Sequence, residues 1–121
     1  MKDRRWIGVD LDGTLAIWDI PWSDDHRLIG APIPAMVQQV KLWLYQGEDV
    51  RIFTARMDGY HPKQGPIPAR TNRRIIGNWC LKHLGAVLPI TNRKDHWCKA
   101  IYDDRAVQVE RDTGRIIGEG K

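Results

Sequence analysis

The chain of 121 residues lacks the features that mark membrane proteins, disulfide frameworks and repeat proteins. Its uninterrupted apolar runs are only a few residues long, far short of the roughly 20 that a membrane-spanning helix needs. Two cysteines are too few for a disulfide framework, and no internal repeat is present. No apolar signal region follows the charged start MKDRRWIGVD, so we expect a cytoplasmic protein with no membrane partner.

Three common ligand motifs are also missing. The residues that could bind zinc together are Cys80, His83, His96 and Cys98. Their C-x2-H and H-x-C pairs do not have the spacing of a zinc finger or ribbon, and Cys80 falls on the apolar stripe of a helical pattern. A calcium loop starting at Asp10 would need Gly and Glu where the chain has Leu15 and Pro21. No G-x4-G-K-[ST] motif is present, which excludes a kinase half of that type.

What the sequence does contain is an alternation of strand and helix patterns. Apolar runs predict strands at residues 6–10, 50–53, 86–90 and 100–104. Helical spacing predicts one helix that starts at Pro34 and ends at Gly47, and a second that starts near Ala69 and ends at Gly85. The tail predicts a β-hairpin that turns at Asp112-Thr113-Gly114. This order is typical of one α/β domain, residues 1–121, with a parallel sheet.

Polar residues of chemical interest follow each predicted strand. They are Asp10, Asp12, Thr54, Lys94, Asp103 and Asp104. Because ligands of parallel sheets bind beyond the carboxyl ends of the strands, these residues should lie at one rim. Asp10 and Asp12 point to the same side of an extended strand, and carboxylates so close together repel unless a cation separates them. Ligands that are all oxygen favour a hard ion such as Mg²⁺.

A magnesium site with paired carboxylates suits phosphate chemistry. One carboxylate can attack phosphorus to give an aspartyl-phosphate, and the second can protonate the leaving oxygen and then activate water. Mg²⁺ and a lysine would neutralise the transferring phosphoryl group, and a threonine hydroxyl after the second strand can hold its oxygens.

Four motifs on these strands carry a family resemblance. DLDGTL, a hydrophobic segment ending in TAR, a lysine after TN, and a hydrophobic segment ending in DDR resemble, in order, the motifs of the haloacid dehalogenase (HAD) superfamily. The chain also looks like the phosphatase half of polynucleotide kinase-phosphatases and small HAD proteins of bacteria and phages. The resemblance implies a three-layer Rossmann-like fold. Residues 15–34 and 56–70, the two places where a cap could be inserted, are too short for a cap domain.

The same resemblance implies roles for individual residues. Asp10 corresponds to the nucleophile and Asp12 to the general acid and base, and an aspartate at this second position marks phosphatases rather than dehalogenases. Thr54 corresponds to the phosphate-binding threonine. Lys94 corresponds to the lysine that stabilises the phosphate, with Lys99 as the competing candidate.

The resemblance also implies a metal-ligand set. Asp10, Asp103 and the backbone carbonyl of Asp12 correspond to the Mg²⁺ ligands. Asp104 corresponds to a second acidic residue that acts on the ion through water.

The substrate is less constrained by the sequence. The net charge is +4, and residues 51–74 are rich in cations. The residues that could contact a phosphorylated substrate are Arg56, Arg70, Arg73, Arg74 and Trp18. The arginines of the second helix could bind a nucleic-acid backbone or form a solvated face, and Trp18 and Trp22 could stack on a base or pack in the core or in a dimer.

Two hypotheses follow. The first is a Mg²⁺-dependent phosphomonoesterase that acts on nucleotide or nucleic-acid-end phosphates, either as a monomer or as a homo-oligomer. The second is a catalytically silent module that uses its basic stretch to bind nucleic acid or another anionic partner.

Overall fold

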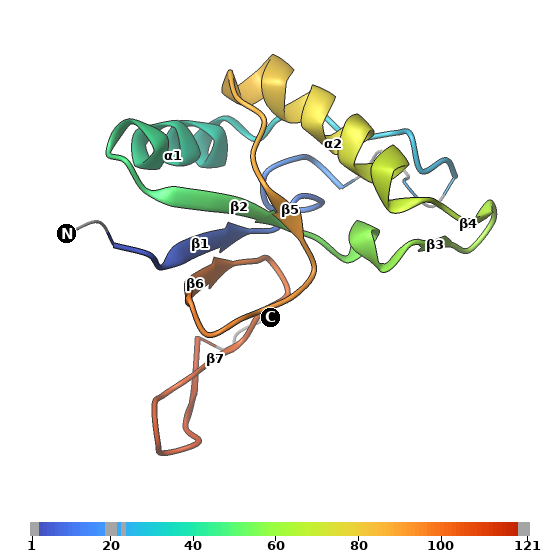
Figure 1. Ribbon diagram of the computed structural model, residues 1–121. Helices are drawn as coiled ribbons and strands as arrows, with labels where there is room; N and C mark the ends of the chain where they lie inside the picture. The colour runs from blue at the N-terminus through green and yellow to red at the C-terminus, as the bar shows by residue number, and fades with distance from the viewer. Residues whose placement is uncertain (1–2, 19–21, 23, 119–121) are drawn as a thin grey trace.

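The computed structural model describes residues 3–18, 22 and 24–118. Four strands form a parallel sheet: β1 (Trp6–Val9), β2 (Asp49–Phe53), β5 (Ile90–Thr91) and β6 (Cys98–Tyr102). Their order across the sheet is β5-β2-β1-β6, with β1 in the centre (Figure 1). Helices α1 (Pro34–Tyr45) and α2 (Ala69–Leu84) connect the first strands, which confirms the predicted α/β class. No helix in these residues has the length and apolar character needed to cross a membrane.

Both helices begin and end close to where the sequence predicts. Pro34 occupies the first turn of α1, where its missing N–H costs nothing, and Val37 and Val40 turn inward. α2 ends at Gly85, which adopts φ +80° and donates its N–H to the carbonyl of Leu81. A left-handed glycine is a common way to end a helix because it has no Cβ to clash.

The helices form a single layer on one face of the sheet (Figure 1). Ile7 and Val9 of β1 pack with Val40 and Ile76 of the helices in one buried cluster. On the opposite face, the fully buried Trp6 donates its indole N–H to Asp95, in the connector 92–97. That connector carries the chain from β5 at one edge to β6 at the other and is too short for a crossover helix. The expected three-layer arrangement is therefore wrong for the described residues, which have two layers.

Two strands have different limits from those that the sequence predicts. The third strand was expected at 86–90 but β5 covers only Ile90–Thr91, because Pro89 has no N–H to donate to a ladder. The fourth was expected at 100–104 but β6 ends at Tyr102. The side chain of Asp103 accepts a hydrogen bond from the backbone N–H of Arg105 at 2.7 Å, and this turn stops the strand.

The loop predicted after β2 contains regular structure. A 3₁₀ turn, η1 (Ala55–Asp58), is followed by a short antiparallel pair, β3 (Tyr60–His61) and β4 (Gly65–Pro66). The predicted C-terminal hairpin is confirmed by β7 (Gln108–Val109) and β8 (Ile116–Ile117). Asp112 in its turn has φ +64°, a conformation that Asp tolerates.

Between β1 and α1, residues 15–17 and residues 31–33 lie side by side and hydrogen-bond to each other. The N–H of Ile17 donates to the carbonyl of Ala31, and the N–H of Ile33 donates to that of Leu15. Gly30 directly precedes residues 31–33, and a Cβ there would lie 2.0 Å from the carbonyl oxygen of Ile17. The indole of Trp79 on α2 donates to the carbonyl of Gly30, so the segment is anchored to the helical layer.

Candidate active site

Three carboxylates meet at the carboxyl ends of β1 and β6. Asp10 directly follows β1, and Asp103 and Asp104 directly follow β6. Because Val9 is in register with Tyr102 and the N–H of Asp10 donates to the carbonyl of Tyr102, the chains leave the sheet side by side. One carboxylate oxygen from each of the three residues lies within 4.8 Å of the others. All three are among the residues that the sequence placed at one rim.

Gly13 and Thr14 hold Asp104 in the cluster. The hydroxyl of Thr14 donates to a carboxylate oxygen of Asp104 at 3.2 Å and accepts the backbone N–H of Asp104 at 3.0 Å. Gly13 has φ +93°, and a Cβ at this position would lie 2.6 Å from the Asp104 carboxylate. The Gly-Thr pair after Asp12 therefore leaves room for this carboxylate and fixes its direction.

Asp10 has an unusual environment for a carboxyl group. Burial, the nearby charge of Asp103 and a hydrogen bond shared with Asp104 together raise the pKa of Asp10 to about 7. A carboxylate that is half-buried beside two others is unfavourable by itself, and a cation would relieve this.

Asp12 faces a different partner. Its two carboxylate oxygens accept hydrogen bonds from Nε and Nη2 of Arg56, each at 2.7 Å. The side chains of Asp12 and Arg56 are only 12% and 3% exposed, so this forked ion pair is shielded from water. The Asp12 side chain is not part of the three-carboxylate cluster, and its orientation is set by Arg56.

Arg56 contacts three parts of the chain. Its Nη1 donates to the carbonyl of His26 at 3.0 Å, and its Nη2 donates to the carbonyl of Leu28 at 2.8 Å as well as to Asp12. The hydroxyl of Thr54 accepts the backbone N–H of Arg56 and caps η1. The carbonyl of Arg56 accepts a hydrogen bond from the buried side chain of Asn72 at the start of α2. Sequence reasoning left Arg56 between substrate contact and loop support, and the contacts show that it fixes Asp12.

A cavity of about 750 Å³ opens beside these residues. Of the residues that the sequence singled out, those lining it are Asp10, Asp12, Trp18, Thr54, Arg56, Asp103 and Asp104. Trp22, Tyr60 and Arg105 line it as well. Tyr60 had no signal in the sequence, and Arg105 appeared only as the last residue of the DDR segment, because the β3–β4 pair and the turn after β6 are what bring them there. Apart from Lys94, the predicted rim thus lines a single cavity.

Of the predicted cations, only Arg56 is among the lining residues. Lys94 is exposed on the connector 92–97, and Arg70, Arg73 and Arg74 are exposed on α2. Lys99, the competing lysine, bonds Glu48 at 2.7 Å and Asp3 at 3.4 Å. These partners lie at the amino ends of the strands, away from the cluster, so Lys99 is not positioned to reach a phosphate there.

The structure offers no support for zinc. Cys80 is buried in the core cluster, where burial raises the pKa of its thiol to about 11. A protonated thiol in an apolar core packs as a small hydrophobe. Within the described part of the chain, the only group of three or more potential metal-binding side chains is Asp10, Asp103 and Asp104.

The chain was also compared with known proteins. No family model matches it, and no curated protein matches it either.

Proposed function

We propose that this protein is a Mg²⁺-dependent phosphomonoester hydrolase of the HAD type that acts through an aspartyl-phosphate on Asp10. One observation carries the proposal: a single cavity holds three clustered carboxylates and, next to them, a fourth that Arg56 fixes separately. Two carboxylates with different environments are what a nucleophile and a proton-transfer group require.

The donor set fits magnesium. The three clustered side chains offer only oxygen, and they lie at an open rim where a small hard cation can keep part of its water shell. Asp10, Asp103 and Asp104 would hold the ion, together with the backbone carbonyl of Asp12. When bound, Mg²⁺ supplies positive charge that lets Asp10 and a phosphate oxygen approach each other.

The chain's own residues then divide the reaction into two steps. In the first, a carboxylate oxygen of Asp10 bonds to phosphorus, the bond from phosphorus to the leaving oxygen breaks, and Asp12 gives that oxygen a proton. In the second, Asp12 takes a proton from water, whose oxygen bonds to phosphorus, and the Asp10–phosphorus bond breaks to release inorganic phosphate. Arg56 orients Asp12 whenever it is ionised, one side of this fork opens while Asp12 carries the proton, and Thr54 lines the cavity where the phosphate would lie.

Arg105 is the cation that we assign to the phosphate in this proposal. It lines the cavity, whereas the four hydrogen bonds of Arg56 leave that guanidinium little capacity for a ligand. The role predicted for Lys94 stays a prediction, since it would require the connector 92–97 to place the lysine differently.

Hydrolysis of p-nitrophenyl phosphate tests the proposed function. We expect turnover with Mg²⁺, loss of turnover with EDTA, and no activity in Asp10→Asn. Asp112→Asn is the matched control, because Asp112 lies in the distant hairpin turn and Asn tolerates its positive φ. The absence of turnover by the wild-type protein on aryl, sugar and nucleotide phosphates would refute the proposal.

The exposed arginines of α2 favour a second candidate, a catalytically silent module that binds nucleic acid. Arg70, Arg73 and Arg74 have exposed side chains within two turns of one helix. This candidate predicts binding to single-stranded DNA that weakens steeply with salt and survives Asp10→Asn, without phosphate release.

A further inference from the structure

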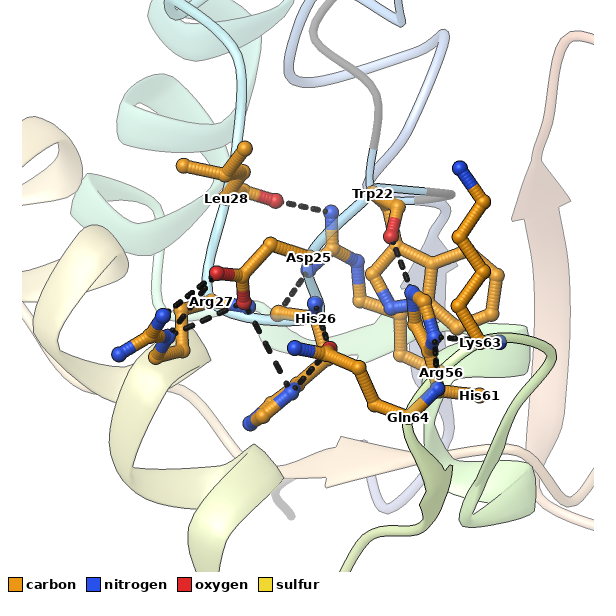
Figure 2. Close-up of polar contacts among 9 residues, drawn as sticks. All are labelled: Trp22, Asp25, His26, Arg27, Leu28, Arg56, His61, Lys63 and Gln64. Atoms are coloured by element: carbon orange, nitrogen blue, oxygen red, sulfur yellow. Dashed lines mark hydrogen bonds and ion pairs between the residues drawn. The ribbon is translucent and has the colours of Figure 1, made fainter.

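Trp18, Trp22 and Tyr60 line the cavity and form its aromatic wall, and two segments far apart in the sequence carry the last two of these rings. Residues 22 and 24–28 follow the Asp10–Asp12 turn, and residues 60–66 contain the β3–β4 pair. Figure 2 shows that they are joined by polar contacts. Gln64 accepts the N–H of His26 at 2.7 Å, and the ammonium of Lys63 bonds Asp24 at 2.9 Å.

His61 makes this junction rigid. It is fully buried, and its Nδ1 accepts the backbone N–H groups of Lys63 and Gln64, each at 3.0 Å. Because Nδ1 accepts twice, the ring proton is on Nε2, which donates to the carbonyl of Trp22 (Figure 2). The His61 ring also packs edge-on against the indole of Trp22, with 4.6 Å between ring centroids. Trp22 is therefore fixed both through its backbone and through its ring.

Arg56 connects this wall to the proposed chemistry. The guanidinium that donates to Asp12 also donates to the carbonyls of His26 and Leu28 (Figure 2). It lies 5.9 Å from the centre of the Trp22 ring. The wall and the acid–base carboxylate are thus held in one arrangement. A group bound against the wall would have a defined position relative to a phosphate at Asp10.

The wall presents aromatic rings to the cavity. Four of the ten aromatic residues of the chain line it: Trp18, Trp22, Phe53 and Tyr60. Trp18 is 46% exposed and Tyr60 is 61% exposed, although both are large rings beside a cluster of carboxylates. Trp22 is held in place, and Trp18 and Tyr60 are accessible, so together these rings are suited to stack on a planar group.

We propose that this aromatic wall recognises the base of a nucleotide whose phosphate reaches Asp10. The proposal rests on the proposed function and specifies its substrate as a nucleotide unit, either free or at the end of a strand. A base offers a flat face to Trp18, Trp22 and Tyr60, and the positive charge of Arg105 at the same cavity suits an anionic ligand.

The test compares substrates that share the phosphate but differ in the base. The panel is adenosine 3′-monophosphate, adenosine 5′-monophosphate, a short single-stranded DNA with a terminal phosphate, phosphotyrosine and ribose 5-phosphate. Wild-type protein should show a higher kcat/KM for at least one nucleotide-containing substrate than for ribose 5-phosphate. Comparing free and strand-end nucleotides then separates the two sources of the same chemistry.

Two variants and a control locate the effect. Trp18→Leu and Tyr60→Leu should each lower the ratio of nucleotide kcat/KM to ribose 5-phosphate kcat/KM by about 10-fold, the typical loss for one stacking contact. Trp97→Leu is the matched control, because Trp97 is similarly exposed at 43% but does not line the cavity. An unchanged ratio in both wall variants, or a preference for phosphotyrosine over every nucleotide, would overturn the proposal.

A binding measurement separates this proposal from the proposed function. In Asp10→Asn, adenosine monophosphates should quench tryptophan fluorescence, ribose 5-phosphate should not, and Trp18→Leu added to this variant should weaken nucleotide binding. If the wild type hydrolyses no phosphate but this binding occurs, phosphatase activity is refuted and base recognition stands. If phosphates are hydrolysed without any dependence on the base, base recognition is refuted and the phosphatase stands.

Discussion

Replacing Arg56 by lysine tests whether this residue positions Asp12. Arg56 is 4% exposed and donates four hydrogen bonds, two to Asp12 and one each to the carbonyls of His26 and Leu28. A lysine keeps the positive charge but has no fork, so it can hold only one side of the Asp12 carboxylate. Each lost bond to a carbonyl costs about 1 kcal/mol, and the lost bond to a carboxylate costs about 1.5–3 kcal/mol.

A lysine ammonium can keep one bond to Asp12 and one to a carbonyl, so it loses one bond of each kind. We therefore expect Arg56→Lys to lower the free energy of unfolding by about 2.5–4 kcal/mol, measured by urea denaturation at constant pH. Arg56→Ala would remove one partner of a buried ion pair, which costs about 3–5 kcal/mol and threatens folding in a domain of this size. The lysine variant is the more informative one because the buried charge is retained.

The positioning of Asp12 can be measured by how strongly kcat depends on the leaving group of the substrate. p-Nitrophenolate departs readily as an anion, whereas in the proposed mechanism an alkoxide would need a proton from Asp12. If Arg56 positions Asp12, Arg56→Lys should lower kcat for glycerol phosphate by roughly 10²–10⁴-fold and for p-nitrophenyl phosphate by much less. Equal losses on the two substrates, or no loss on either, would refute the reasoning.

Arg51→Lys is the matched control for this experiment. Arg51 is also partly buried and bonds Asp49 at 3.1 Å, with its guanidinium 4.8 Å from the centre of the Trp6 ring. It lies on β2 outside the cavity lining. Its replacement should affect stability but leave the ratio of the two activities unchanged.

Four further predictions concern the backbone, the metal, the pH dependence without metal and the substrate charge. Gly30→Ala should lower the free energy of unfolding by about 1–3 kcal/mol in urea denaturation, because the added Cβ would clash with the carbonyl of Ile17. Gly77→Ala is the control: this residue lies inside α2 with the nearest side-chain atom at 3.4 Å, so the change should be neutral or stabilising by up to about 1 kcal/mol. Mg²⁺ should raise the melting temperature more at pH 8 than at pH 5.5. With a pKa near 7, Asp10 binds a proton at the lower pH, and this proton competes with the ion. A larger shift at the lower pH would contradict this prediction. Without metal, the free energy of unfolding should change with pH in the opposite direction. The raised pKa of Asp10 contributes stability that is fully present below about pH 4 and is lost as the pH rises through about 7. Urea titrations at a series of pH values would measure this loss. Arg105→Ala should raise KM for a nucleotide substrate more than Lys94→Ala does, because only Arg105 lines the cavity, and the reverse order would restore Lys94 to the predicted role.

Features that depend on strand order were predictable from the sequence. Asp10 and Asp103 were expected to meet because both follow apolar runs in an alternating pattern, and the carboxyl ends of parallel strands lie at one edge. The helix limits at Pro34 and Gly85 were predictable because each residue has a specific conformational role. These are local signals, and the parallel topology converts them into a shared site.

Features that depend on contacts between irregular segments were not predictable. The pairing of Arg56 with Asp12 spans 44 residues and requires the carbonyls of residues 26–28 to face the same guanidinium. The β3–β4 pair was missed because its two strands have two residues each and include Pro66, which weakens any strand pattern. The third layer was expected from the family resemblance, whereas the connector 92–97 has no residues to spare for a helix.

Because β6 is an edge strand, binding of a cation next to it should affect how often this edge of the sheet opens. In the described residues β6 pairs only with β1, yet it supplies two of the three clustered carboxylates. Local opening of this edge strand would separate Asp103 and Asp104 from Asp10 and disrupt the proposed cation site. A cation that binds only the closed arrangement would therefore stabilise this edge strand against opening. The amide hydrogens of β6 should exchange with solvent more slowly when Mg²⁺ is bound, while those of the hairpin β7–β8 should be indifferent to it.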